Sequence, residues 1–279
     1  MKISNHALLL ALLALPMRCF SAEPIITAAD KPVRLIRGVT LYSADTGVQL
    51  EKGDIVESGA STLQIELPPN LVAAIAPKSK LYLAKTHPFQ LCVLEGWVKL
   101  TTKGEDASLS STFLRADLKN NSVVLRAEVE KSEIFSEEGG ISVNALEHGA
   151  PNGDDIKITQ EQTAQRLLGQ RLKDLPRPSK EFISGMPKPF RDPLGPNYKP
   201  GFKVVAPQAQ VGVQYGDLSP WLNANLPYKK DWVKRFKPQL KDPQFRKSLD
   251  AELGESAEWK PILHPPVKKS ATVSTGALY

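Results

Sequence analysis

Cationic and aromatic residues are concentrated near the carboxyl-terminal end of the sequence. The cations fall within nine residues: Lys229, Lys230, Lys234, Arg235 and Lys237. Trp221, Trp232 and Phe236 are interleaved with them. Cations beside aromatic rings suit the binding of glycans, peptides or nucleic acid. The simpler interpretation is that the aromatic residues form the core of a small helical unit, while the charges are only solvated.

Helical spacing separates the two kinds of residue. On a helix over residues 228–237, Lys230, Lys234 and Lys237 share one face, and Trp232 and Phe236 share another. We expect the aromatic face to be buried and the cationic face to be exposed to an acidic partner surface or an anionic polymer. The candidate partner-binding residues are therefore the five cations and Trp221.

Residues for catalysis are not grouped in this sequence. After the first 22 residues the histidines are His87, His148 and His264, which are far apart. The sequence contains no HExxH motif, no G-x-S-x-G nucleophile elbow, no P-loop and no dinucleotide-binding motif. We therefore expect a protein that is not an enzyme, with no catalytic, metal-binding or cofactor-binding residue and no cofactor. An enzyme of the cell envelope is the third and weakest interpretation.

The amino-terminal residues predict export. Lys2 precedes an apolar run over residues 7–15, and Ser21 and Ala22 supply the small residues of a cleavage site. This is the plan of a signal peptide over residues 1–22, and the run is too short to span a bilayer. Lipidation at Cys19 is disfavoured, because the preceding Met17 and Arg18 are not small. No later run is long enough for a transmembrane anchor, and export argues against a nucleic-acid partner.

Charge divides the rest of the chain into two parts. Residues 23–155 carry a net charge of −6, and residues 156–279 carry a net charge of +10. A basic tail on an acidic head fits an anionic partner, although a solvated surface gives the same pattern.

Cys92 is the one cysteine outside the first 22 residues, so no internal disulfide is expected there. Its place in an alternating apolar run favours a buried core residue over a reactive thiol.

Short alternating runs separated by turn residues fill the acidic head. In the run over residues 61–67, Leu63, Ile65 and Leu67 fall on one face. Ten such runs between residues 32 and 146 predict a mainly β fold, either a short-stranded sandwich or a short β-solenoid.

The turn residues of the head follow a recognisable order. Gly53-Asp54-Ile55-Val56 comes first with Ser58 and Ser61, then Pro77, Ser79, Leu81 and Leu83, and then Leu94-Glu95-Gly96-Trp97-Val98. Over residues 33–145 this order resembles the FecR-type periplasmic domain. The resemblance implies a β-structured sensing or scaffolding module located in the periplasm. The sequence departs from the family pattern at Pro68-Pro69-Asn70 and at residues 126–129.

The sequence therefore predicts six segments. They are a signal peptide (1–22), a FecR-like β domain (30–150), a connecting helix (157–175), a proline-rich strap (176–210), a small helical aromatic and basic subdomain (211–266) and a disordered tail (267–279). The part after the β domain is similar to a carboxyl-terminal extension, of unknown role, on some FecR-domain envelope proteins. The predicted function is binding, scaffolding or sensing in contact with another envelope protein. The alternative is a module that binds the cell wall or another envelope glycan.

Overall fold

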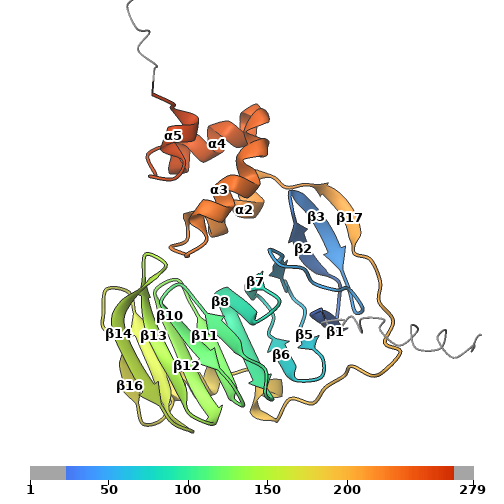
Figure 1. The fold of residues 1–279 in the computed structure, drawn as a ribbon, viewed down its shortest axis with the longest axis vertical. Helices are drawn as coiled ribbons and strands as arrows, with labels where there is room; N and C mark the ends of the chain where they lie inside the picture. The colour runs from blue at the N-terminus through green and yellow to red at the C-terminus, as the bar shows by residue number, and fades with distance from the viewer. Residues whose placement is uncertain (1–22, 267–279) are drawn as a thin grey trace, which may run out of the picture.

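The computed structural model describes residues 23–266. The predicted signal peptide, Cys19 and the predicted tail over residues 267–279 lie outside the described residues. The seventeen strands form one hydrogen-bonded network that folds into two layers, so the mainly β fold class is confirmed (Figure 1).

Each layer is a row of neighbouring strands. Layer A runs β1 (Ile25–Ala29), β5 (Leu63–Leu67), β6 (Leu71–Ile75), the second half of β8 (Phe89–Thr102), β11 (Ser122–Ala127), β12 (Lys131–Glu138), β15 (Thr163–Leu167) and β16 (Lys173–Leu175). Layer B runs β17 (Gln208–Gly212), β3 (Thr40–Ala44), β2 (Val33–Arg37), β4 (Ile55–Glu57), β7 (Lys80–Lys85), the first half of β8, β9 (Ala107–Ser110), β10 (Leu114–Leu118), β13 (Ile141–Glu147) and β14 (Ala150–Ile158). All these pairs are antiparallel except β8 with β9. Such pairing is that of a sandwich and not of a solenoid, whose stacked strands are parallel.

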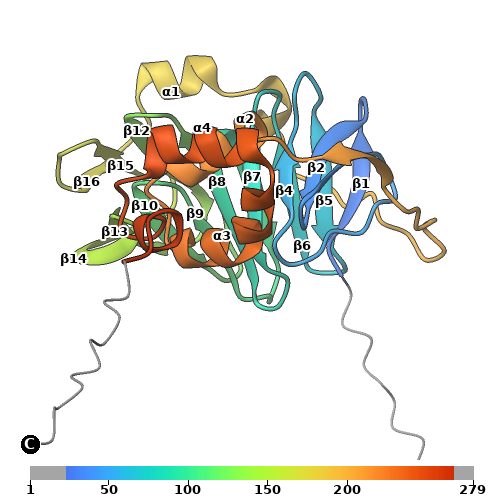
Figure 2. The ribbon, with the colours of Figure 1, turned by 90° about the horizontal axis from the view of Figure 1, so that it is seen from above.

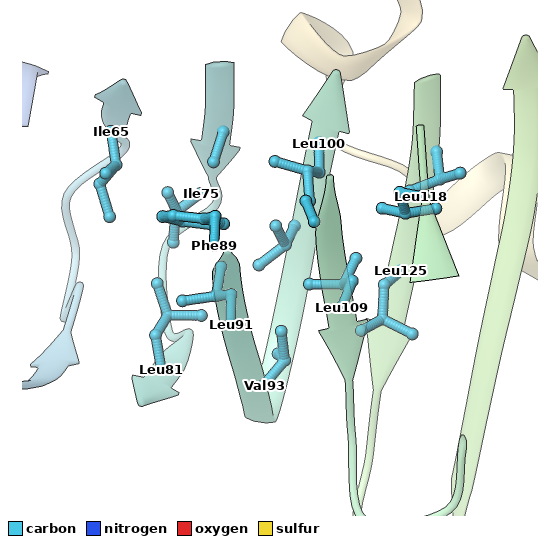
Figure 3. Packing of buried hydrophobic residues seen from close by; sticks show 14 of the residues in the cluster. Ile65, Ile75, Leu81, Phe89, Leu91, Val93, Leu100, Leu109, Leu118 and Leu125 are labelled. Atoms are coloured by element: carbon cyan, nitrogen blue, oxygen red, sulfur yellow. The ribbon is translucent and has the colours of Figure 1, made fainter. Parts of the chain in front are cut away.

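The main core lies between the two layers, where alternate residues of each strand meet. Leu63, Ile65 and Leu67 of layer A are buried there, together with Leu81 and Leu83 of layer B. Figure 3 shows side chains of both layers interdigitating, among them Ile65 and Leu81. The prediction that these leucines and Ile65 share one buried layer is confirmed.

One long strand joins the layers. The first half of β8 pairs with β7 and β9, and its second half pairs with β6 and β11. The change of layer occurs at Gly96, which has φ of +103°. A Cβ atom there would lie 2.6 Å from the Cα of Ser79, so only glycine fits this turn of the strand.

The other residues of the FecR-like motif also have structural tasks. The buried Asp54 carboxylate accepts the Arg37 guanidinium and the Glu51 N–H, which closes the turn before β4. The Ser58 hydroxyl accepts the Ser79 N–H at 2.8 Å and donates to a neighbouring carbonyl. The motif therefore holds turns together, as its turn-forming residue types indicate.

The predicted connecting helix over residues 157–175 is wrong, because this segment contains β15 and β16. Leu167, Leu168, Leu172 and Leu175 have the spacing of one helical face. In the structure, however, Leu168 is 62% exposed, and Arg166 is buried with hydrogen bonds to backbone carbonyls. Pairing with the open edge of β12 overrides the helical propensity of the segment. The β structure consequently extends from residue 25 to residue 175, beyond the predicted limits of 30 and 150.

The proline-rich strap covers the outer face of layer A. It contains α1 (Lys180–Gly185) and the short 3₁₀ helix η1 (Lys188–Arg191), and its last predicted residues begin β17. Phe182, Met186 and Phe190 are buried against this layer, and the rings of Phe182 and Trp97 lie 4.9 Å apart.

Two buried charges fix the strap through its backbone. Lys99, only 2% exposed, pairs with Glu137 and donates to the carbonyls of Phe190 and Asp192, each at 2.8 Å. On the same face the Glu66 carboxylate accepts the Asn197 N–H at 2.7 Å. These hydrogen bonds are formed with backbone atoms of the strap, so they hold it in place even where few of its side chains are buried.

Four short helices and a 3₁₀ helix form a cap on the outer face of layer B (Figures 1 and 2). They are α2 (Tyr215–Asn223), α3 (Lys229–Phe236), η2 (Lys237–Lys241), α4 (Pro243–Leu253) and α5 (Lys260–Leu263). Asp242 caps α4 by accepting the Gln244 N–H at 2.8 Å. The aromatic residues of the cap share one core with Ile36, Ile55 and Tyr82 of layer B, so the cap is continuous with the head. No helix within residues 23–266 is long and apolar enough to cross a membrane.

Candidate functional site

Helix α3 is anchored to layer B by its aromatic face. Trp232 and Phe236 are buried, and the Trp232 ring lies 4.6 Å from the ring of Tyr82 on β7. Trp232 and Phe236 stack on each other with centroids 6.1 Å apart. This packing confirms the expected burial of the aromatic face and gives α3 a fixed orientation.

Arg235 serves the fold. Its guanidinium donates to the carbonyls of Gly38 at 2.7 Å, Ile36 at 3.1 Å and Gly53. It also lies over the Phe236 ring at 4.9 Å, and burial lowers the pKa of this guanidinium. Half-buried and bound to three backbone carbonyls, Arg235 is less available than an exposed lysine, and its contact with a partner stays a prediction.

Two further candidate residues, Trp221 and Lys229, also make contacts within the fold. Trp221 has no exposed surface and packs within the core of the cap, so it cannot contact a partner. Lys229 is half-buried and donates to the Asn225 side chain at 3.1 Å. The helical spacing over residues 228–237 did not separate these residues from the exposed ones, because Trp221 lies on another helix, α2, and Asn225, the partner of Lys229, precedes α3.

Three of the candidate cations form an exposed set, which we call the lysine face: Lys230, Lys234 and Lys237. Within residues 23–266, none of their three ammonium groups forms an ion pair or a hydrogen bond. Asp231 is the exposed acidic residue of α3, and Lys241 adds a fourth exposed lysine at the end of η2. The lysine face is thus a rigidly mounted set of unpaired positive charges.

The other chemically interesting groups of the sequence are separated or buried. No group of three histidine, cysteine, aspartate or glutamate side chains suited to a metal ion occurs in the part of the chain that the structure describes. Cys92 is fully buried, and burial raises the pKa of its thiol to about 12. This position fits the predicted core residue, because a thiol that stays protonated is a poor nucleophile.

Comparison with known proteins gives little further guidance. Neither a protein-family model nor a curated protein matches the chain. Two crystal structures of a putative anti-sigma factor from Parabacteroides distasonis are similar to part of it, each with 10% identity and a TM-score of 0.37. The matches cover 48% and 49% of this chain, and 62% and 64% of that protein. This chain therefore matches less than two thirds of that protein, and a likeness of this degree supports no inference about function.

Proposed function

We propose that this protein is a non-catalytic module of the bacterial periplasm that binds another envelope protein through the lysine face. The observation that carries the proposal is the exposure of Lys230, Lys234 and Lys237 without a partner on a firmly anchored helix. The predicted signal peptide over residues 1–22 and the FecR-like order of turn residues support the proposed location.

An acidic protein surface is the partner that this geometry fits. Charges that are four and three residues apart on a helix lie along one line, so they can face a row of carboxylates. Exposed lysines contribute little to folding, but opposite charges across an interface accelerate association and select the partner. Because α3 is fixed by Trp232, Phe236 and Arg235, its backbone needs little ordering before the lysines bind.

The test is crosslinking of envelope material to the full chain, followed by capture and mass spectrometry at low and moderate salt. The test variant is Lys230→Ala/Lys234→Ala/Lys237→Ala. Each substitution is expected to change the free energy of unfolding by about 0.5 kcal/mol or less, because all three side chains are exposed. Capture of one abundant protein by wild type, reduced by salt and lost in the variant, supports the proposal.

A matched control removes three exposed lysines on the strap: Lys188, Lys199 and Lys203. It lowers the net charge equally and is expected to keep the captured partner. Equal capture by wild type and the α3 variant at both salts would show that the lysine face is only solvated. Capture that disappears after digestion of the wall polymer would instead favour the anionic polymer as partner.

A further inference from the structure

A regular polar surface lies on the part of layer B that the cap leaves uncovered. On β8, β9, β10, β13 and residues 155–158 of β14, every second residue points into the core, and the residues between them point to the outer side of the layer. Of these outer residues Ser108 is only 7% exposed. These strands are neighbours in layer B, each paired with the next. Cross-strand pairing aligns their outward residues into two rows, which we call the polar face.

The first row is formed by directly paired residues on the five strands: Gln90, Ser108, Asp117, Ser142 and Lys157. The two serines have short side chains and stand on either side of Asp117. A solvated sheet face normally carries long side chains that cover its backbone, whereas short ones leave a depression. The sequence thus places a shallow site at the centre of this row.

The second row is bounded by the cap. It runs through Cys92, Ser110, Arg115, Asn144 and Asp155. Cys92 is buried beneath the cap, and Ser110 is buried as well. Arg115 forms an ion pair with Asp117 at 2.9 Å, which links the two rows.

A hollow of about 540 Å³ is lined in part by the first row. Gln90, Ser108, Asp117 and Ser142 contribute to its wall, together with residues at the strand ends such as Pro88 and Gly140. This volume lies within the range of about 300–1,000 Å³ that is usual for small-molecule sites.

The charges around the hollow balance. Two of its lining residues are cationic and two are anionic, and they pair as Arg115 with Asp117 and as Lys119 with Asp106, the latter at 3.1 Å. An ionic ligand would therefore gain no net attraction. The amide of Gln90 and the serine hydroxyls instead offer both donors and acceptors to a neutral ligand.

We propose that the polar face is a binding site for a neutral oligosaccharide. A sugar chain presents alternating hydroxyl donors and acceptors on an uncharged, extended body, which matches the lining in charge, in hydrogen-bonding capacity and in open shape. No aromatic ring lines this hollow, so stacking does not add to the affinity. Hydrogen bonds that replace bonds to water give modest gains, and we expect a Kd of about 0.1–1 mM.

The test is an NMR titration of the isotope-labelled full chain, with a β-1,4-linked N-acetylglucosamine tetramer and cellotetraose as probes. We expect amide shifts centred on Ser108, Asp117 and Ser142 with at least one probe. The affinity should stay constant when salt is raised, because the site has no net charge. Absence of shifts with both probes at about 10 mM, ten times the weakest Kd expected, would overturn the proposal.

Substitutions locate the binding. Ser142→Trp fills the hollow from an exposed position and should weaken binding at least tenfold, and Asp117→Leu should do so by replacing a carboxylate acceptor with an apolar side chain. Ser184→Trp, on α1, is the matched control and should bind as wild type does. Unchanged binding in both Ser142→Trp and Asp117→Leu would refute the site. The proposal is independent of the lysine face, since the triple lysine variant should bind the sugar normally.

Discussion

Phe182 is the side chain whose loss should release the strap. It is fully buried in α1, with its ring 4.9 Å from Trp97 and 6.2 Å from Phe135. Phe182→Ala removes both ring contacts and leaves a cavity between the strap and layer A. The neighbouring Ile183 is 44% exposed and makes a matched control.

The expected magnitude follows from burial. Truncation of a buried phenylalanine to alanine costs about 3–5 kcal/mol, and the two ring pairs place Phe182 within that range and not below it. Because Phe182 lies under the strap and not between the layers, this loss falls mainly on strap docking. Each 1.4 kcal/mol is a factor of ten, so the undocked population should rise by about two to three and a half orders of magnitude.

Limited trypsin digestion measures this population. When opening is fast relative to cleavage, the cleavage rate follows the fraction of open molecules. Lys180 and Arg191 are exposed on the strap and supply the sites. We expect slow cleavage in wild type and a nearly unchanged rate in Ile183→Ala. In Phe182→Ala the cleavage rate should be higher by about two to three and a half orders of magnitude. Equal rates in the two variants would show that Phe182 does not hold the strap.

Three further predictions concern groups held inside the fold: two substitutions and the reactivity of one thiol. Lys99→Met leaves the carbonyls of Phe190 and Asp192 without their donor, so it too should accelerate cleavage of the strap. Arg235→Met removes three donated hydrogen bonds between α3 and layer B, and urea unfolding should show a loss of about 2–4 kcal/mol. Cys92 should not react with a thiol reagent at pH 8 until the protein unfolds, because burial raises its pKa from 9.0 to about 12. Since that raised pKa favours the protonated folded state, the Cys92 contribution to stability is complete below about pH 9 and is lost as the pH rises towards about 12.

Strand periodicity made the head predictable from its sequence. With a period of two, every second residue must face the core, so alternation alone puts Leu63, Ile65 and Leu67 on the buried side of their strand. The helix predicted around Leu168 is wrong because a leucine spacing typical of a helix also occurs in a segment that completes a sheet. There the open edge of β12, which no local pattern reveals, decided the conformation.

The candidate site was only partly predictable for a similar reason. Spacing along α3 correctly separated Lys230 from Trp232, because both positions follow the helical period. It could not separate Lys230 from Arg235, whose partners Gly38 and Gly53 are 197 and 182 residues away in sequence. The polar face was missed altogether, since its rows exist only after five strands have paired in register.

The cap and β17 come from the last third of the chain, yet they complete strands from the first third. β17 pairs with β3, and Arg34 of β2 forms an ion pair with Asp217 of α2. A growing polypeptide makes β2, β4 and β7 long before the helices that cover Ile36, Ile55 and Tyr82. Contacts of such long sequence separation slow folding, and apolar surface left open meanwhile favours aggregation.

Because of this order of synthesis, the outer side of layer B is covered only after the last helices have been made. A chain interrupted before residue 215 lacks every helix of the cap, so the apolar outer side of β2, β4 and β7 stays in contact with water. We expect such a fragment to expose an apolar surface that favours aggregation, and not to form a smaller stable protein. A chaperone that shields this surface until the final helices pack would therefore act on the incomplete fold, because in the finished molecule the cap buries Ile36, Ile55 and Tyr82.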